Sequence, residues 1–431
     1  MSTASTYFIA PMRARSTTAE TIGHFLVAMI FLSSFYVKVE PAVCDIMFFL
    51  AIIFFYRSGL NLAPALAPLF LCLLVYNVAG LVSYIMIADD TLSSWQYVFT
   101  SFYMSLSGFF FAAYVAADPE TRFQFIMKYY FYAATIAAIL GFLGYFHLAS
   151  FLEQFVFYGR MVSGFKDPNV FATYLMLPAV VALQALMLGK MRYSPFNIAA
   201  LLSILMAIFL AFSRGAWINF LMSALLMIAL TFMNSPDHRQ RAGIALKAVI
   251  VIFIMCIIIA ALLSIKETQA LFLDRFTLLK SYDAGELGRF GNQRNAVPML
   301  LGRPFGFGPL QFPVIFNEAP HNTFLNAFSS FGWVGGITFF LMVILNLFIG
   351  LRLAFSRTPF QASAIAVFSC LIAITFQGVQ IDTEHWRHLY WMIGILWGFF
   401  AAAQMRGRDG FSAHEILEGW QGNAHAKTLK L

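Results

Sequence analysis

Charged residues are scarce in this sequence: Asp, Glu, Lys and Arg make up only 11% of its 431 residues. A soluble chain has about 25% charged residues, because it must cover its surface with polar groups. Hydrophobic residues instead make up 61% of the chain and include 50 Phe. This composition excludes an ordinary soluble enzyme and a disordered protein, and it indicates that lipid surrounds most of the chain. We therefore interpret the net charge of +7 as a membrane-orientation signal and not as a sign of nucleic-acid binding.

Cysteine is also rare, which excludes a secreted scaffold built on disulfides. Each of the four cysteines lies in an apolar run far from the others, so we expect small buried hydrophobic residues and no metal framework. The four are Cys44, Cys72, Cys256 and Cys370. A cleavable signal peptide is not evident, because the apolar stretch after Arg13 and Arg15 lacks a small-residue cleavage pattern. We expect that stretch to remain as a membrane span.

Long apolar runs fill most of the sequence, and a transmembrane helix needs about 20 such residues. Twelve spans are predicted near 21–38, 41–57, 63–88, 96–117, 122–146, 169–189, 195–213, 215–233, 243–264, 322–352, 359–380 and 387–404. The expected fold is therefore an all-α polytopic membrane protein with about twelve transmembrane helices. Without an internal repeat, we expect one membrane domain over 1–431 with a large polar loop at 265–321. The tail, 405–431, is polar and shows no fold of its own.

The distribution of Lys and Arg predicts the orientation of these spans. With both termini in the cytoplasm, 16 of the 27 Lys and Arg lie inside and 11 outside, six of them in 265–321. Positive residues accumulate on the cytoplasmic side. Both termini and the tail are therefore predicted to be cytoplasmic, whether or not the long loop is counted.

Arg214 is the first candidate for a functional residue, because it lies at a predicted turn on the outer side, where the positive-inside rule disfavours it. An arginine near the membrane usually has a partner or a task, and its planar guanidinium suits phosphate. The alternative is an arginine that reaches the interface for solvation alone. Gly215 allows a tight turn or a close approach of substrate.

His321 is the second candidate, in Pro320-His321-Asn322 at the start of the tenth predicted span. We expect it at or just before a helix N-terminus, where the helix dipole disfavours imidazolium and leaves a neutral base. The same position favours an anionic ligand. A histidine at an interface can also be purely structural.

Further arginines lie among glycines and aromatic residues of the outer segments. The long loop contains Gly288-Arg289 and Arg294, and the shorter segment after the fifth span contains Gly159-Arg160. This pattern suits phosphate and sugar, although a solvated loop could have it as well. In the shorter segment, Asp167 and Pro168 predict the start of the sixth helix.

A metal site is the alternative for the last outer loop, which contains Asp382, Glu384, His385 and His388. The sequence has no HExxH motif and no Cys pair there. We favour a charged turn at the membrane interface beside Trp386.

Together these residues resemble the bacterial O-antigen ligases and their polysaccharide-polymerase relatives. His321-Asn322, nine further residues, Gly332, two residues and Gly335 match that family's signature of His-Asn/Ser/Gln, nine residues and Gly-x-x-Gly. The other similar segments are Ser213-Arg214-Gly215, Gly288-Arg289, Pro304-Phe305-Gly306-Phe307-Gly308, Gly159-Arg160 and Asp167-Pro168-Asn169.

The resemblance implies a membrane glycosyltransferase of the bacterial inner membrane with a periplasmic active site and no metal or other cofactor. It would move a glycan from a polyprenyl diphosphate carrier to an acceptor hydroxyl on lipid A–core or on a growing polysaccharide. His321, as the base, and Arg214 would be the catalytic residues, and Arg160, Arg289 and Arg294 would bind the diphosphate together with Arg214. Asn322 and Gly215 would support them.

Two alternatives remain open on the sequence. The first is an O-antigen or exopolysaccharide polymerase of the same family. Classical O-antigen polymerases have Arg, ten residues and Gly in two periplasmic loops, but Phe171, Leu225 and Leu300 stand where that Gly would follow Arg160, Arg214 and Arg289. This favours a ligase. The second is a flippase or secondary transporter of twelve spans, against which the missing repeat and nearly uncharged spans argue. A structural scaffold would not explain the outer arginines.

Overall fold

A computed structural model describes residues 18–58, 60, 62–87, 93–191, 194–276, 288–406 and 411–421. Each of the predicted spans coincides with a helix, or with two helices in series for the sixth. These helices are α1 (Thr18–Ser33), α2 (Val43–Ser58), α3 (Ala67–Ile85), α4 (Ser94–Ala117), α5 (Pro119–Tyr145), α6 (Pro168–Tyr174), α7 (Met176–Met187), α8 (Pro195–Leu210), α9 (Arg214–Asn234), α10 (His238–Leu263), α14 (Thr323–Ala354), α15 (Gln361–Gln377) and α16 (Arg387–Met405).

Seven helices in the described part of the chain are long and apolar enough to cross a membrane. They are the helices at Pro64–Ile85, which includes the 3-10 turn η1 (Pro64–Leu66), Ser94–Ala117, Pro119–Tyr145, Pro168–Met187, Arg214–Asn234, His238–Leu263 and Thr323–Ala354. Shorter apolar helices accompany them, among them α1 and α8. The chain is therefore an integral membrane protein with multiple spans, and the number twelve stays a prediction.

Polar capping residues begin several of these helices, as the sequence predicts at Asp167. The Asp167 side chain accepts hydrogen bonds from the backbone N–H groups of Asn169 and Val170, and Pro168 opens α6. Ser213 caps α9 by accepting from Ala216 N. Such residues satisfy N–H groups that have no partner within the helix. They hold polar residues at the helix ends, where the candidate site lies.

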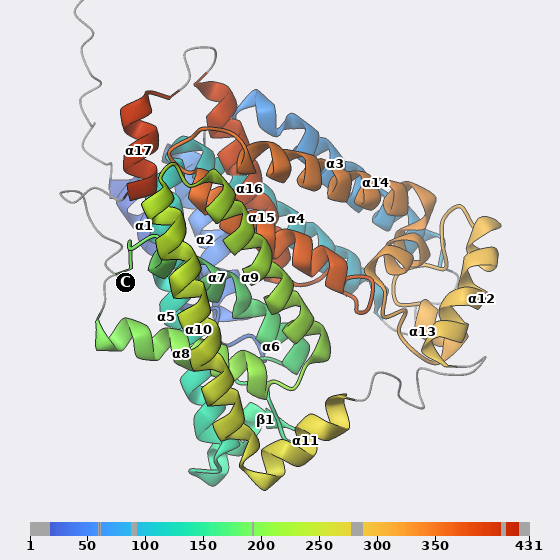
Figure 1. Ribbon diagram of the computed structural model, residues 1–431. Coiled ribbons are helices and arrows are strands. Elements are labelled where there is room, and N and C mark those ends of the chain that lie inside the picture. Colours follow the sequence, from blue (N-terminus) through green and yellow to red (C-terminus); the bar gives the residue numbers. More distant parts are fainter. Residues whose placement is uncertain are drawn as a thin grey trace, which may run out of the picture.

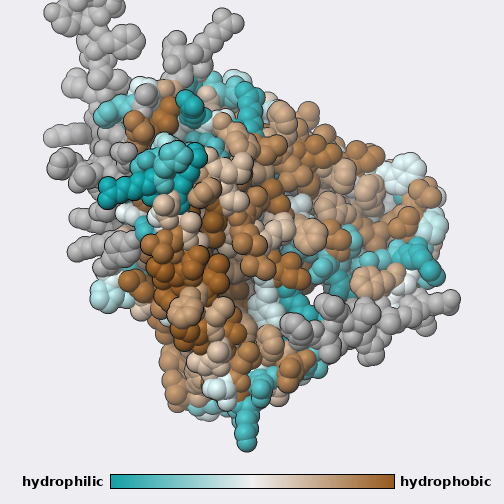
Figure 2. Space-filling view, in the orientation of Figure 1, coloured by the Kyte–Doolittle hydropathy of each residue, from teal (hydrophilic) through white to brown (hydrophobic). Residues whose placement is uncertain are grey.

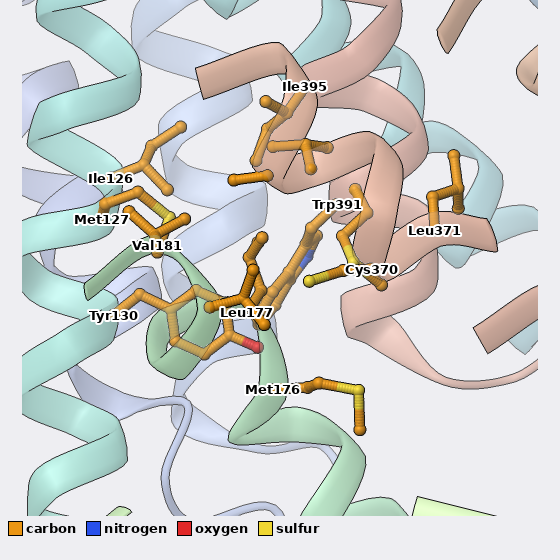
Figure 3. Packing of buried hydrophobic residues seen from close by; sticks show 14 of the residues in the cluster. Ile126, Met127, Tyr130, Met176, Leu177, Val181, Cys370, Leu371, Trp391 and Ile395 are labelled. Carbon is orange, nitrogen blue, oxygen red and sulfur yellow. The ribbon is translucent and has the colours of Figure 1, made fainter. Parts of the chain in front are cut away.

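The helices pack as a bundle around an apolar core (Figure 1). Figure 3 shows side chains of α5, α7, α15 and α16 pointing toward one another, and Trp391 lies next to Cys370 and Leu177. Trp391 and Cys370 are buried, as are Cys44 and Cys72, whereas Cys256 is exposed on α10. The expectation of buried cysteines is therefore wrong for Cys256, because α10 buries only a small part of its surface.

The surface of the bundle is apolar over most of the view in Figure 2. Hydrophilic residues gather at the end of the bundle where α10 begins, and others lie beside the lobe formed by α12 (Arg289–Leu301) and α13 (Phe312–Phe316). α10 contains the most apolar 18-residue stretch of the seven long helices, and only 11% of that stretch is buried. A helix so apolar and so exposed needs lipid around it.

The two segments predicted to lie outside contain secondary structure that the sequence did not predict. Helix α11 (Lys266–Phe276) and helices α12 and α13 occupy much of 265–321, and residues 277–287 lie outside the described part of the chain. The shorter segment forms the 3-10 helix η2 (Ser150–Phe155) and a hairpin of β1 (Val156–Phe157) with β2 (Arg160–Met161). The all-α prediction holds apart from these short strands.

The polar tail also differs from the prediction, because it folds in part. Helix α17 (Ala413–Gln421) docks on the bundle, with Trp420 2% exposed. The Trp420 indole N–H donates to Gln361 Oε1 at 3.3 Å, and the Lys190 ammonium donates to the Gly419 carbonyl. A buried tryptophan and a hydrogen bond from Lys190 anchor this short helix, and polar composition alone does not reveal such contacts.

Candidate functional site

Arg160 is held by the hairpin at the end of the bundle where α6, α9 and α14 begin, which we call the site end. Tyr158 and Gly159 both have positive φ, 48° and 72°, as a two-residue hairpin turn requires. The turn directs the chain back so that Arg160 Nε donates to the Ala211 carbonyl at 3.0 Å. Its guanidinium also reaches Asn169 Oδ1 at 3.4 Å. Arg160 therefore lies beside the end of α8 and the start of α6.

Arg214 lies next to the same contacts, because it is the first residue of α9. Its neighbour Ser213 donates from Oγ to Asn169 Oδ1 at 2.6 Å, and Asn169 thus connects Ser213 with Arg160. The Arg214 side chain is half-buried. The structure therefore brings together two arginine segments that are more than fifty residues apart in the sequence.

Gln377, the last residue of α15, connects this arginine region with the start of α14. Its Oε1 accepts from Thr173 Oγ at 3.2 Å and from Asn219 Nδ2. Gly215 approaches the same side chain so closely that a Cβ there would lie 3.3 Å from Gln377 Nε2. The sequence predicts that Gly215 allows a tight turn or a close approach of substrate. In the structure, the group that approaches Gly215 closely is the side chain of Gln377.

His321 lies directly before the N-cap of α14, as predicted. Asn322 is the N-cap, and its Oδ1 accepts from Leu325 N at 3.0 Å. The Asp382 carboxylate accepts from both His321 N and Asn322 N, at 3.1 and 2.9 Å. His321 has a φ of 48°, which is unfavourable for a residue with a side chain. The two bonds to Asp382 help to hold this conformation.

Two further side chains define the surroundings of His321. The Arg289 guanidinium donates to the carbonyls of His321, at 3.1 Å, and of Gln380. Glu318 Oε1 lies 3.5 Å from His321 Nε2, close enough to stabilise an imidazolium. Arg289 therefore holds the backbone at His321, whether or not it also binds a ligand. Arg294 is exposed on α12, and no hydrogen bond within the described residues connects it with His321.

The signature glycine Gly332 is the point where α14 breaks. Its φ of 67° and ψ of −168° belong to a region that only glycine adopts readily. In a regular helix Trp333 N would donate to the Ser329 carbonyl, but it donates to the Pro304 carbonyl at 2.9 Å instead. Phe307 N donates to the Ser329 carbonyl at 2.7 Å. The segment 303–308 thus inserts into the break in α14. Residues 323–331 form a separate half-helix, and His321 lies directly before its N-cap Asn322.

Buried acidic residues support this half-helix from the loop between α15 and α16. Glu384 is 3% exposed, and its Oε1 accepts from the Tyr97 hydroxyl at 2.9 Å and from Asn326 Nδ2. Burial, together with the charge of Asp382, raises the pKa of Glu384 to about 8. Burial also raises the pKa of Asp382 and lowers that of His385 to about 3. The expected charged interfacial turn is therefore wrong for Glu384 and His388, both of which are buried.

A pocket between α14, α15 and α16 ends at the first turn of α14. Its lining is apolar except for Asn346, Thr375 and the end formed by Thr323, Gly378 and Thr383. Thr323 N donates to the Gly378 carbonyl at 2.7 Å, which fixes that end next to His321. The described residues contain no group of three or more His, Cys, Asp or Glu side chains placed to hold a metal ion.

The structure thus places Arg160, Arg214 and Gly215 in one region, and Arg289, His321 and Asn322 in another, with Gln377 and Gly378 between them. Sequence reasoning missed Glu318 and Asp382 as neighbours of His321. For Glu318 the spacing of three residues before His321 was a usable signal, whereas the contact of Asp382 spans about sixty residues.

One comparison with known proteins bears on this site. Residues 198–340 match the O-antigen ligase family, and the match includes Arg214, Arg289, Arg294, His321 and Gly332 but not Arg160. No curated protein matches the chain. The region from α8 to the kink in α14, which carries most of the candidate site, therefore belongs to a known family: the chain carries a domain of the O-antigen ligase family.

Proposed function

We propose that this protein transfers a glycan from a polyprenyl diphosphate carrier to an acceptor hydroxyl at the periplasmic face of the bacterial inner membrane. The family match implies a lipid-linked glycan as substrate. The observation that carries the proposal is that His321 and Arg289 lie at the same end of the bundle as Arg160 and Arg214, with Gln377 and Gly378 between the two pairs. A hydroxyl nucleophile needs a base, and a diphosphate leaving group needs positive charge.

His321 is the proposed base. Its imidazole removes the proton of the acceptor hydroxyl while that oxygen attacks the anomeric carbon of the donor glycan. The imidazolium that forms lies 3.5 Å from the Glu318 carboxylate, which stabilises its charge. Asp382 and Arg289 hold the histidine backbone and so fix where the ring stands.

The arginines are the proposed partners of the leaving group. As the new bond forms, the bond between the anomeric carbon and the diphosphate oxygen breaks, and polyprenyl diphosphate leaves with the bonding electrons. Arg214 and Arg160 neutralise its charge, with Arg289 and Arg294 as further ligands. Guanidinium groups can bind phosphate oxygens in pairs. No metal or other cofactor is required in this scheme.

Lipid A–core is the proposed acceptor, which makes the protein a ligase of lipopolysaccharide assembly. The support is the missing glycine eleven residues after Arg160, Arg214 and Arg289. A polymerase that extends a growing polysaccharide is the second candidate. Purified protein in lipid nanodiscs, given labelled donor and either acceptor, distinguishes them: label joins lipid A–core for a ligase and a second repeat unit for a polymerase.

Arg214→Lys tests the proposed guanidinium contact with the diphosphate. We expect kcat/KM for glycan transfer to fall by about ten-fold or more, because lysine keeps the charge but cannot form two parallel hydrogen bonds. The measurement is transfer to the preferred acceptor at several donor concentrations. Arg303→Lys is the control, since Arg303 is exposed over the Phe307 ring at 5.2 Å. An equal loss in both variants, or none in Arg214→Lys, contradicts the contact.

A further inference from the structure

We infer that Glu384 is a positioning residue for the transfer reaction: its carboxyl group fixes the half-helix 323–331, and so His321, in place, and we call this contact the clamp. The inference rests on the proposed function, but the clamp itself can be measured without it. The geometry consists of a closed set of hydrogen bonds among three side chains from three parts of the fold.

The three side chains are those of Glu384, Tyr97 and Asn326. The Tyr97 hydroxyl donates to Glu384 Oε1 at 2.9 Å and accepts from Asn326 Nδ2 at 2.9 Å, while Asn326 Nδ2 also contacts Glu384 Oε1. Asn326 lies in the middle of the half-helix, one turn after Asn322. These bonds fix the rotation of the half-helix about its axis, and they do so from α4 and from the loop before α16.

The loop residues just before Glu384 form hydrogen bonds with the first turn of the same half-helix. Thr383 N donates to Thr323 Oγ at 2.8 Å, and Thr323 Oγ donates to the Ile381 carbonyl at 2.9 Å. Asp382 binds the backbone of His321 itself. A displacement of Glu384 would therefore be passed through two residues of the loop to the histidine.

Among the described residues, Glu384 has no positively charged partner that would stabilise its carboxylate. Its Oε2 is buried and has no hydrogen-bond partner in the described part of the chain, and no Lys or Arg there lies within ion-pair distance of it. The titratable groups facing it are Asp382 in the same loop, Tyr97 on α4, Tyr76 on α3 and Tyr390 on α16. None of them supplies a positive charge, and His385 beside Tyr97 is neutral because burial lowers its pKa to about 3.

The consequence is a dependence on pH with a defined sign. Burial and Asp382 raise the pKa of Glu384 from 4.5 to about 8, so the folded protein holds this proton more tightly than the unfolded chain. The stability that Glu384 contributes is therefore fully present below pH 4.5, falls as the pH rises from there, and is lost once the pH has passed about 8. Ionisation places a second negative charge beside Asp382, and we expect the repulsion between the two carboxylates to displace the loop from the half-helix even though the bonds that Glu384 accepts from Tyr97 and Asn326 become stronger.

Glu384→Gln, Glu384→Ala and the wild-type protein together test the inference. Glutamine imitates the neutral acid, so we expect its kcat to stay within about three-fold of wild type near neutral pH and to lack the wild-type fall above pH 8. Alanine removes the clamp, and we expect kcat to fall by about ten-fold or more with KM nearly unchanged, because Glu384 touches no substrate. Identical alkaline limbs in wild type and Glu384→Gln would overturn the inference, even if Glu384→Ala failed to fold.

Hydrogen exchange separates this inference from the proposed function. In the purified wild-type protein we expect the amides of residues 323–331 to exchange faster as the pH rises past about 8, after correction for the intrinsic pH dependence. In Glu384→Gln we expect no such change. A wild-type protein that shows this change but transfers no glycan refutes the proposed function and leaves the clamp, whereas equal exchange in both proteins refutes the clamp.

Discussion

His321→Ala is expected to lower kcat for glycan transfer by about 10²–10⁴-fold, the range that a general base contributes. The acceptor hydroxyl would then have to lose its proton to water. KM for the lipid-linked donor should change little, because the arginines bind its diphosphate. The measurement is transfer in nanodiscs at saturating donor, with donor binding measured separately.

His147→Ala is the matched control for this variant. His147 lies at the end of α5, has a φ of 51° like the 48° of His321, and stands 3.8 Å from Glu153 as His321 stands near Glu318. Its side chain is 68% exposed, and its ion-pair partner Glu153 belongs to η2 and not to the loop before α14. Full activity of His321→Ala, or an equal loss in His147→Ala, would show that His321 is not the base.

Gly332→Ala is expected to abolish transfer and to lower the stability of the protein. A Cβ at this position would collide with the Pro304 carbonyl and lie 2.8 Å from Phe305 Cα. The backbone conformation alone costs about 1–3 kcal/mol for a residue other than glycine. We expect the segment 303–308 to be expelled from the break in α14, so that the half-helix loses the geometry of the site. Thermal melting in detergent and the transfer assay measure the two effects.

Gly243→Ala serves as the control for a glycine in a helix with room around it. No atom lies within 4 Å of a Cβ placed at Gly243 in α10. Alanine there should leave transfer unchanged and stabilise the helix by about 0.5–1 kcal/mol. If Gly332→Ala melts and transfers like Gly243→Ala, the inserted segment is not needed for the site.

The signature spacing illustrates what the sequence can reveal and what it cannot. The distance from His321 to Gly332 was visible in the sequence, and so was the start of a helix after His321. The sequence does not show why a glycine is needed at position 332. The reason is that the Pro304 carbonyl enters the helix and accepts the hydrogen bond that Trp333 N would otherwise donate within α14. Ser83 on α3 fixes the same insertion by donating to the Phe305 and Ser330 carbonyls, at 2.7 and 2.8 Å. Such contacts between distant segments leave no periodicity to read.

The acidic loop before α16 is a second case in which contacts with distant segments decide the function of residues. The spacing of Asp382 and Glu384 in the sequence predicts only a metal site or a charged turn. Their function in the fold depends on Asn326 and Tyr97, which approach from α14 and α4. The membrane spans, by contrast, were predictable because their length and apolar composition are local properties. The helix α17 was missed because one buried Trp420 anchors it.

The most direct test of the account follows both substrates of one reaction in a sealed vesicle. Purified protein is reconstituted with donor labelled in the glycan and with lipid A–core, and the products are separated after a single turnover. We expect one labelled lipid A–core for each polyprenyl diphosphate released, and loss of both products in His321→Ala. Movement of intact donor across the bilayer, with the glycan still joined to its diphosphate, would contradict it and identify a flippase instead.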